Sequence, residues 1–321
     1  MRQSPPSRHV VSSSWSSGAI PSPLLRIVSL VPHATELLFA LGLGDQVVGV
    51  THECDHPIEA TEREQVTRDM LPAGLSAAQI DAAVRERTEA GQSIYALDEE
   101  LLREMEPDLI VTQALCPVCA VSYDEVKELA AAMPSAPRVL SLDPKTYGET
   151  LGDVRTVAQA TGARDAALTL VASASRRADA IRLAVRDAPR PRVAALEWMD
   201  PVFVAGHWTP QLIEMAGGLD VLGFAGESSE QSTWEAVAAA QPEVVVVMPC
   251  GYDAPRALEE AHAYANELRA LDARRVVAVD ASAYFARPGP RLIDGLEVLA
   301  WTLHPDRVPE PTVDRPLTVE L

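Results

Sequence analysis

The sequence predicts an α/β protein with two Rossmann-like lobes and mainly parallel sheets, joined by one long backbone helix, with a ligand cleft between the lobes. Short apolar strands alternate with helical segments on both sides of residues 145–188, a pattern typical of parallel sheets. Residues 165–187 contain neither Gly nor Pro and would span about 35 Å as a helix. The pattern Glu100-x6-Pro107-Asp108 before one strand returns as Glu235-x6-Pro242-Glu243 before another. This spacing of about 135 residues indicates a duplicated lobe.

Strands in the first half are expected where short runs of Val, Ile and Leu end at a proline or a polar loop, at 27–31, 47–51, 109–112 and 138–142. Helices are expected at 35–41, 77–87, 99–105 and 123–132. Gly42 ends the first of these helices, and Pro107 closes the third. Ser122 and Glu125 form the capping-box pattern that begins the fourth.

Two longer helical segments then interrupt the alternation, at 146–161 and 165–187, separated by Gly162. Beyond them, strands are expected at 193–196, 202–204, 244–248 and 276–279, and helices at 209–215, 234–240, 257–271 and 290–303. The predicted domains are a disordered tail (1–24), an N-terminal lobe (25–145), a helical linker (146–189) that includes the backbone helix 165–187, a C-terminal lobe (190–304) and a Pro-rich tail (305–321).

The composition excludes several kinds of partner. The 321 residues include 46 Asp and Glu against 27 Lys and Arg, a net charge of −19 at pH 7. Nucleic acids and anionic membranes require a basic surface, so neither is an expected partner. No apolar run approaches the roughly 18 residues of a transmembrane helix, so no membrane span is expected. Residues 1–24 lack the apolar core of a signal peptide, which predicts a cytoplasmic protein as encoded. We expect a monomer.

Ligands of open α/β sheets bind at the carboxyl ends of the strands, so the loops that follow strands supply the candidate site. These loops are rich in polar and aromatic side chains, although aromatic residues make up only 5% of the chain. The candidate ligand-binding residues are His33, His52, Glu53, Cys54, Asp55, Gln113, Trp198, His207, Trp208, Tyr252, Tyr284, Phe285 and Arg287. A cleft lined in this way suits a large, flat, amphipathic ligand. The alternative is that the Trp and Tyr side chains fill the cores of the lobes.

No enzyme is expected from the motifs. The chain has no GxGxxG after its first strand, no Walker A sequence and no GxSxG elbow. Asp108 and Glu243 precede strands, on the side away from the expected cleft, and are interpreted as helix-end and turn residues in preference to an acid/base pair. No catalytic residue is therefore assigned.

The Cys116-Pro117-Val118-Cys119 segment leaves three interpretations open. It lies between a strand and a helix, as a thioredoxin-like redox pair would. It could instead join His52 and Cys54 in a site for a soft metal such as zinc, although a single CxxC is only half of a site. In the third interpretation, these cysteines are small loop residues that pack near the ligand.

Four segments resemble class III, helical-backbone substrate-binding proteins of the iron-siderophore and vitamin B12-binding family: 27–36 (IVSLVPHATE), 48–57 (VGVTHECDHP), 106–110 (EPDLI) and 284–291 (YFARPGPR). The resemblance covers essentially the whole expected ordered chain. Within the family, THECD at 51–55 and LCPVC at 115–119 look like the cobalamin-binding branch.

The resemblance implies a corrinoid such as cobalamin, held between the lobes as a ligand with no required cofactor. Cobalt or zinc contact by His52 or a thiolate is compatible with their donor chemistry. It also implies an ABC transporter permease and ATPase as partners, with Glu100 and Glu235 docking on the permease. The alternatives are a ferric-siderophore or haem-type ligand, and a cytoplasmic thiol or metal protein that uses Cys116 and Cys119. Family members are usually exported, so a mis-assigned start would make the protein periplasmic or cell-surface.

Overall fold

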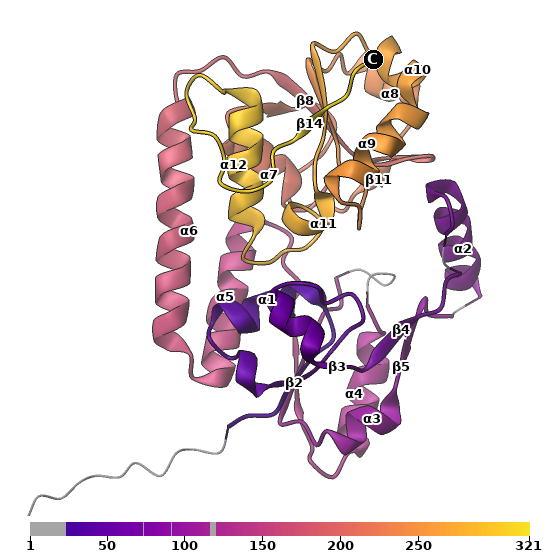
Figure 1. Ribbon diagram of the computed structural model, residues 1–321, viewed down its shortest axis with the longest axis vertical. Helices are drawn as coiled ribbons and strands as arrows, with labels where there is room; N and C mark the ends of the chain where they lie inside the picture. Colours follow the sequence, from indigo (N-terminus) through magenta and orange to yellow (C-terminus); the bar gives the residue numbers. More distant parts are fainter. Residues whose placement is uncertain (1–23, 73, 91, 116–119) are drawn as a thin grey trace, which may run out of the picture.

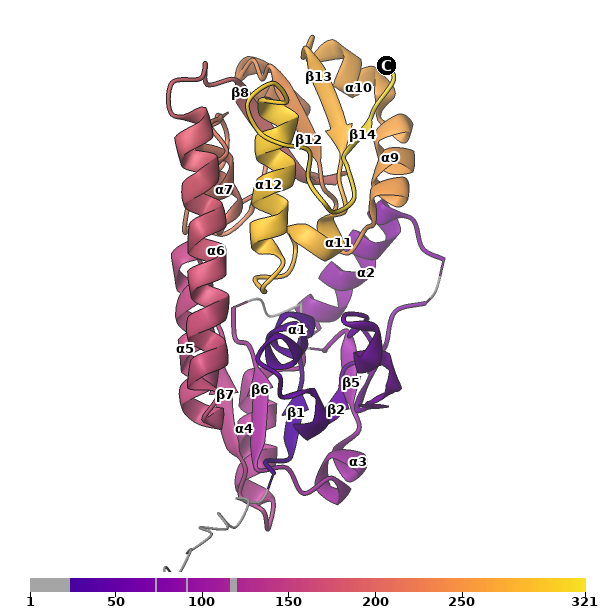
Figure 2. The same cartoon turned by 60° about the vertical axis from the view of Figure 1, so that its left-hand side comes forward.

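The computed structural model describes residues 24–72, 74–90, 92–115 and 120–321. They form two α/β lobes stacked along the long axis of the molecule, with helix α6 running beside both (Figures 1 and 2). The predicted fold class is confirmed. The predicted disordered tail lies outside the described residues except for Leu24. In the described part of the chain, no helix is long and apolar enough to cross a membrane.

The N-lobe is built on a five-stranded parallel sheet of order β3-β2-β1-β6-β7. Its strands are β1 (Ile27–Ser29), β2 (Val47–Val50), β3 (Glu64–Gln65), β6 (Leu109–Thr112) and β7 (Arg138–Ser141). Its helices are α1 (Pro32–Ala40), α3 (Glu99–Glu104) and α4 (Tyr123–Ala132). Alternate residues of each central strand enter cores on opposite faces of the sheet: Ile27 packs with α1, and Val28 packs with α3 and α4.

The C-lobe sheet is mixed, with order β11-β9-β8-β12-β13-β14 and β10 also paired with β8. Its strands are β8 (Arg192–Met199), β9 (Val202–Val204), β10 (Leu219–Asp220), β11 (Glu230–Gln231), β12 (Val244–Val247), β13 (Arg275–Ala278) and β14 (Leu317–Thr318). Its helices are α7 (Thr209–Met215), α8 (Trp234–Ala239), α9 (Ala254–Ala263), α10 (Ala265–Ala270), α11 (Ala281–Tyr284) and α12 (Leu292–Leu303). The central strands β8, β12 and β13 are parallel, so the carboxyl ends of this core share one edge.

The linker is a pair of packed helices, α5 (Tyr147–Thr161) and α6 (Arg164–Val185). Ala167 near the start of α6 belongs to the N-lobe core, whereas Ala174 and Val185 belong to the C-lobe core. Arg177 donates to Glu297 and Asp294 and so fixes α6 against α12. Helix α6 is therefore the predicted backbone helix, because one rigid element contributes to both cores.

The internal repeat is reproduced in atomic detail. Asp108 exchanges hydrogen bonds with the backbone of Arg26, and Glu243 does the same with Arg192. Glu106 and Gln241, each directly before the repeated proline, both adopt positive φ, at 42° and 46°. Asp108 and Glu243 thus serve as turn residues before a strand, as the sequence predicted.

Three segments differ from the sequence prediction. Residues 60–95 contain an antiparallel ribbon, β4 (Thr67–Asp69) with β5 (Tyr95–Leu97), which carries the expected helix α2 (Ala77–Glu89) at its end. The single helix expected at 257–271 is broken at Tyr264, whose ring stacks on Trp234. The expected Pro-rich tail contributes β14, which pairs with β13 and buries Val319.

Candidate functional site

The loop after β2 is held in place from within its own lobe. The Cys54 thiol lies 3.0 Å from Thr35 Oγ1 and 3.1 Å from Thr51 Oγ1. The His52 Nδ1 atom lies 2.8 Å from Thr67 Oγ1, and its ring centroid is 5.4 Å from that of Tyr95. Cys54 is buried, so the residues beside it form the accessible part of this loop.

Glu53 connects this loop to both lobes. Its carboxylate accepts a 3.0 Å hydrogen bond from the Tyr95 hydroxyl of the N-lobe. Its backbone carbonyl accepts a 3.2 Å hydrogen bond from Arg287 of the C-lobe. Asp55, two residues further, pairs with the same guanidinium at 2.5 Å. The structure therefore brings the predicted residues Glu53, Asp55 and Arg287 together across the lobe boundary.

Two further side chains of the C-lobe lie near this group. Glu197 is on β8 and Cys250 follows β12, and the Cys250 amide donates to the Glu197 carbonyl at 3.2 Å. Burial and then the charges of Glu197 and Glu53 raise the pKa of the Cys250 thiol to about 12, although the residue itself has solvent access. Burial is the larger cause, and the two carboxylates, one from each lobe, act in the same direction.

Burial acts to raise the pKa of the carboxyl and hydroxyl groups here. Burial raises the pKa of Glu197 to about 7 against a smaller lowering by the Ser229 hydroxyl. Burial and the adjacent Glu53 carboxylate raise the pKa of Tyr95 well above its usual range. Partial burial acts to raise the pKa of Asp55, but hydrogen bonds and charge from Arg287 outweigh it and leave that pKa lowered.

Most of the predicted aromatic contacts lie in the C-lobe cores. Trp208, Tyr284 and Phe285 are buried in one core, and the Trp208 indole donates to the Phe285 carbonyl at 2.7 Å. Tyr252 is buried in the other core, edge-on to half-buried Trp198 and 3.7 Å beneath the Arg256 guanidinium. The core-filling alternative therefore describes these side chains in this structure.

The remaining predicted residues occupy separate places. His33 is buried in α1, where burial lowers its pKa to about 4 and its Nε2 has no partner among the described residues. Gln113 is buried directly after β6. His207 has a φ of 52°, its amide donates to the Glu227 carbonyl, and burial and the charge of Lys145 lower its pKa. Both histidines are therefore neutral near pH 7.

The described residues contain no group of three or more His, Cys, Asp and Glu side chains that could hold a metal ion. His52 and Cys54 are engaged with threonine hydroxyls. Cys116 and Cys119 lie outside the described residues, so the three interpretations of that pair stay predictions.

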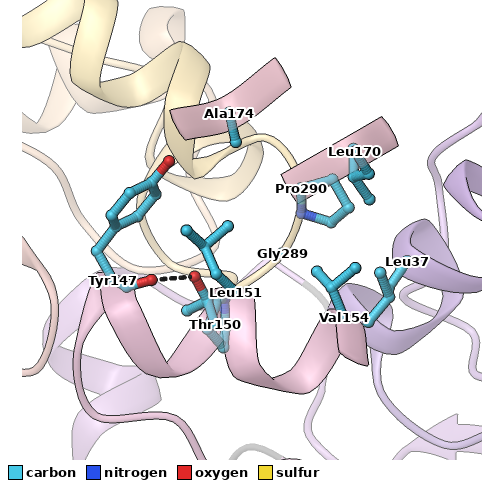
Figure 3. Close-up of a pocket in the computed structure, with 10 residues that line it drawn as sticks. Leu37, Tyr147, Thr150, Leu151, Val154, Leu170, Ala174, Gly289 and Pro290 are labelled. Carbon is cyan, nitrogen blue, oxygen red and sulfur yellow. Dashed lines mark hydrogen bonds between the residues drawn. The ribbon is translucent and has the colours of Figure 1, made fainter. Parts of the chain in front are cut away.

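A small cavity of about 20 Å³ lies elsewhere, between α1, α5, α6 and the loop before α12 (Figure 3). Leu37, Val154 and Leu170 give it an apolar lining, and the Thr150 hydroxyl at its edge donates to the Tyr147 carbonyl at 2.7 Å. A cavity of this size accommodates about one water molecule. It is therefore a packing gap beneath the linker helices.

The two predicted docking residues occupy equivalent positions. Glu100 is the second residue of α3 and Glu235 the second of α8, and both are exposed. The two helices lie toward opposite ends of the molecule (Figure 1). Hydrogen bonds from its own amide and from Thr233 hold the pKa of Glu235 below its usual range, so its carboxylate is charged at neutral pH.

The sequence prediction of the site omitted Tyr95 and Glu197. The apolar pattern Ile94-Tyr95-Ala96-Leu97 before the α3 helix was the available signal for β5, which presents Tyr95. Glu197 follows the apolar residues of β8, at the sheet edge where the candidate loops were sought.

Comparison with known proteins identifies the family. The family model described as periplasmic binding protein matches residues 27–283. The chain belongs to the periplasmic binding protein family. Its two lobes and backbone helix are those of solved structures of this class. The periplasmic haem-binding protein of Pseudomonas aeruginosa is 19% identical, with a TM-score of 0.68 over 92% of this chain and 98% of that one. The periplasmic vitamin B12-binding protein of Vibrio cholerae is 22% identical, with a TM-score of 0.63 over 88% and 97%.

Curated relatives of this periplasmic binding protein cover most of its length. The vitamin B12-binding protein of Vibrio cholerae is 23% identical over 284 residues, 87% of this chain and 89% of that protein. An uncharacterized ABC transporter substrate-binding lipoprotein of Bacillus subtilis is 27% identical over 298 residues, 89% and 82% of the two chains. The predicted family is thus confirmed, and these similarities include proteins named for two different ligands.

Proposed function

We propose that this periplasmic binding protein binds cobalamin or a related corrinoid between its lobes and delivers it to the permease and ATPase of an ABC import system. The similarity to the vitamin B12-binding protein of Vibrio cholerae over 87% of the chain carries the proposal. The THECD segment at 51–55 supports it, because this loop lies at the lobe boundary beside Tyr95 and Arg287. This role requires a location outside the cytoplasmic membrane, in place of the cytoplasm expected from residues 1–24.

The charges at the lobe boundary favour a corrinoid over haem. Glu53, Asp55 and Glu197 contribute carboxyl groups there, and Arg287 is already paired with Asp55 and Glu36. A corrin carries a rim of neutral amides, which Glu53 and His52 can meet with hydrogen bonds. Haem presents two propionate carboxylates, which would face these acidic groups, and the Arg287 guanidinium beside them is already paired. Haem is the second candidate, because the haem-binding protein of Pseudomonas aeruginosa shares the fold.

The ligand test is calorimetric titration with aquocobalamin, cobinamide, haemin and a ferric siderophore, followed in parallel by absorption spectra. We expect aquocobalamin to bind and haemin to bind about 10-fold or more weaker, since unpaired charges oppose it. A shift of the corrin bands would indicate axial contact with cobalt, and unchanged bands on binding would contradict such contact. Failure of both corrinoids to bind would reject the proposal, and tight haemin binding alone would favour the second candidate.

The binding loop is tested by Glu53→Gln, with Glu59→Gln as the matched control on the exposed neighbouring turn. Glu53→Gln alters the acceptor that Tyr95 uses, and it should weaken corrinoid binding by about 10-fold. Glu59→Gln should leave the affinity unchanged. Equal affinities of the two variants would exclude Glu53 from the site.

The thiol alternative has its own test. Metal analysis of protein purified under reducing conditions should show no stoichiometric zinc if corrinoid import is the function. One zinc that survives dialysis, and that is lost when Cys116 and Cys119 are both replaced by Ser, would favour the thiol or metal protein instead.

Permease docking is tested by Glu100→Lys and Glu235→Lys. Their exposed carboxylates at equivalent helix starts suit contact with a basic surface, one on each lobe. The double variant should associate with the permease at least about 10-fold more weakly while still binding ligand. The control Glu104→Lys with Glu259→Lys changes the net charge equally at exposed positions of α3 and α9. An equal loss of permease affinity in the control variant would show that the change in net charge alone explains the effect, and would contradict a docking role for Glu100 and Glu235.

A further inference from the structure

Two arginines from one C-lobe loop converge on a single buried carboxylate of the N-lobe. Glu36 on α1 has a side chain only 2% exposed. Arg291 donates to it twice, at 2.9 and 2.6 Å, and Arg287 donates once, at 3.3 Å. The loop between these arginines lies close to α1, because a Cβ on Gly289 would be 3.4 Å from Glu36 Oε2. The lobes are thus joined here by a desolvated ion pair in addition to α6.

The two arginines differ in what else they hold. Arg287 also donates to both Asp55 carboxylate oxygens, at 2.5 and 3.2 Å, and to the Glu53 carbonyl at 3.2 Å. Arg291 donates to Glu36 alone among the described N-lobe residues. Arg291 therefore links the C-lobe to helix α1, whereas Arg287 links it to the loop after β2.

That loop has independent attachments to the N-lobe. Cys54 and His52 are held by Thr35, Thr51 and Thr67, and the Glu53 carboxylate is held by Tyr95. Only the Glu53 carbonyl and the Asp55 carboxylate connect to Arg287. A separation of the lobes that breaks these bonds would free the Glu53 carbonyl and the Asp55 carboxylate, while Cys54 and the Glu53 carboxylate stay anchored to the N-lobe.

We propose that Arg287 is a positioning residue that couples lobe orientation to the shape of the 52–55 loop, and that it does not itself contact the ligand. Its donors are directed at Glu36, Asp55 and Glu53 when the lobes are together. The loop is then held in one arrangement, and lobe opening releases it. The importance of this coupling for binding rests on the proposed function, because it takes 52–55 as the ligand loop.

The test compares Arg287→Lys with Arg291→Lys by hydrogen–deuterium exchange of the ligand-free protein. Both variants weaken the hydrogen bonds to Glu36. Only Arg287→Lys also removes the two guanidinium hydrogen bonds to the Asp55 carboxylate and the one to the Glu53 carbonyl. We expect the amides of Glu53 and Asp55 to exchange about 10-fold faster in Arg287→Lys and at nearly the wild-type rate in Arg291→Lys, whereas the Cys54 amide, which donates to the Thr51 carbonyl, should change little in both variants. Asp55→Asn, which leaves Glu36 untouched, should reproduce the effect of Arg287→Lys, and the double variant should add little. Unchanged exchange in Arg287→Lys, or equal acceleration in both arginine variants, would overturn the proposal.

Titration of the same variants with aquocobalamin and haemin forms the second arm. For whichever ligand the wild type binds, Asp55→Asn and Arg287→Lys should weaken binding by similar factors, because both release the same loop. A much larger loss for Arg287→Lys than for Asp55→Asn would indicate direct ligand contact and overturn the positioning role. If the wild type binds neither ligand, the proposed function fails, while the exchange comparison still decides the coupling.

Discussion

Single side chains at the lobe boundary have pKa values that burial and neighbouring charges change. Glu197 is attached to the C-lobe sheet, and burial among its surroundings raises its pKa to about 7. A carboxyl whose pKa is raised on folding binds its proton more tightly in the folded state. Its contribution to stability is therefore complete below the unfolded pKa of about 4.3 and is lost as the pH rises through about 7.

Glu197→Gln should remove that contribution. The free energy of unfolding of Glu197→Gln relative to the wild type should rise steadily between about pH 4.5 and 7 and level off above. Urea unfolding at several pH values in this range measures the difference. Glu259→Gln, at an exposed position of α9, should show no such trend. A flat difference for Glu197→Gln would mean that its carboxyl titrates normally.

Asp55 should show the opposite dependence. Its lowered pKa means that its pairing with Arg287 stabilises the fold above the unfolded pKa of about 3.9 and is lost as the pH falls through the folded pKa. The stability advantage of the wild type over Asp55→Asn should therefore decline progressively as the pH falls below about 4. Urea unfolding at pH 7 and at pH 3 tests this. An advantage as large at pH 3 as at pH 7 would contradict it.

The helices that link the lobes depend on their ends as well as on their packing. Helix α5 begins with a complete capping box, in which the Thr146 hydroxyl accepts from the Glu149 amide and the Glu149 carboxylate accepts from the Thr146 amide. Gly162 ends the same helix with a φ of 81°, a conformation that glycine adopts without steric strain. The sequence analysis used Gly162 as the end of this helix, because a C-terminal glycine is a local signal.

Thr146→Ala should destabilise the protein by about 1 kcal/mol, because an orphan amide of α5 loses its acceptor. Thr169→Ala is the matched control, because Thr169 is exposed within α6 and its hydroxyl donates a hydrogen bond to the Asp165 carbonyl of the preceding turn. Chemical denaturation of both variants measures the difference. Equal stabilities would show that the cap contributes nothing in this context.

At the scale of the whole molecule, the net charge of −19 opposes compaction through self-repulsion. Raising NaCl from about 10 to 150 mM shortens the Debye length from about 30 to 8 Å. We therefore expect the melting temperature to rise by a few degrees. Glucose at equal osmolality should not reproduce the rise, and a melting temperature that is unchanged or falls in salt would contradict this account. The Glu36 ion pair should be less affected, because its carboxylate is buried.

Periodicity and local end signals predicted most of the fold. The Val244–Val247 strand, helix α4 and the division by a long helix all follow from residues close together in the chain. The repeat around Glu100 and Glu235 predicted two related lobes, and the structure places both residues alike. The ribbon of β4 and β5 escaped prediction because two short strands separated by α2 lack a continuous pattern. Tyr264, where the expected helix breaks, stacks on Trp234, a contact between residues that are distant in the chain and so absent from any local pattern.

The local sequence was sufficient to predict the architecture and the family, and to single out the loop at 51–55 as a candidate. Strand alternation, helix caps and motifs are formed by residues that are close together in the chain, so they can be read without the structure. Only the tertiary structure decided which loop side chains face the lobe boundary. Trp208 and Phe285 turn into the core, whereas Glu53 and Asp55 of one lobe meet Arg287 of the other. Loops have no regular period from which a side chain's direction can be inferred. The hydrogen bonds from Arg287 and Arg291 to Glu36 join residues about 250 positions apart in the chain. Their geometry therefore exists only after both lobes have packed against α6.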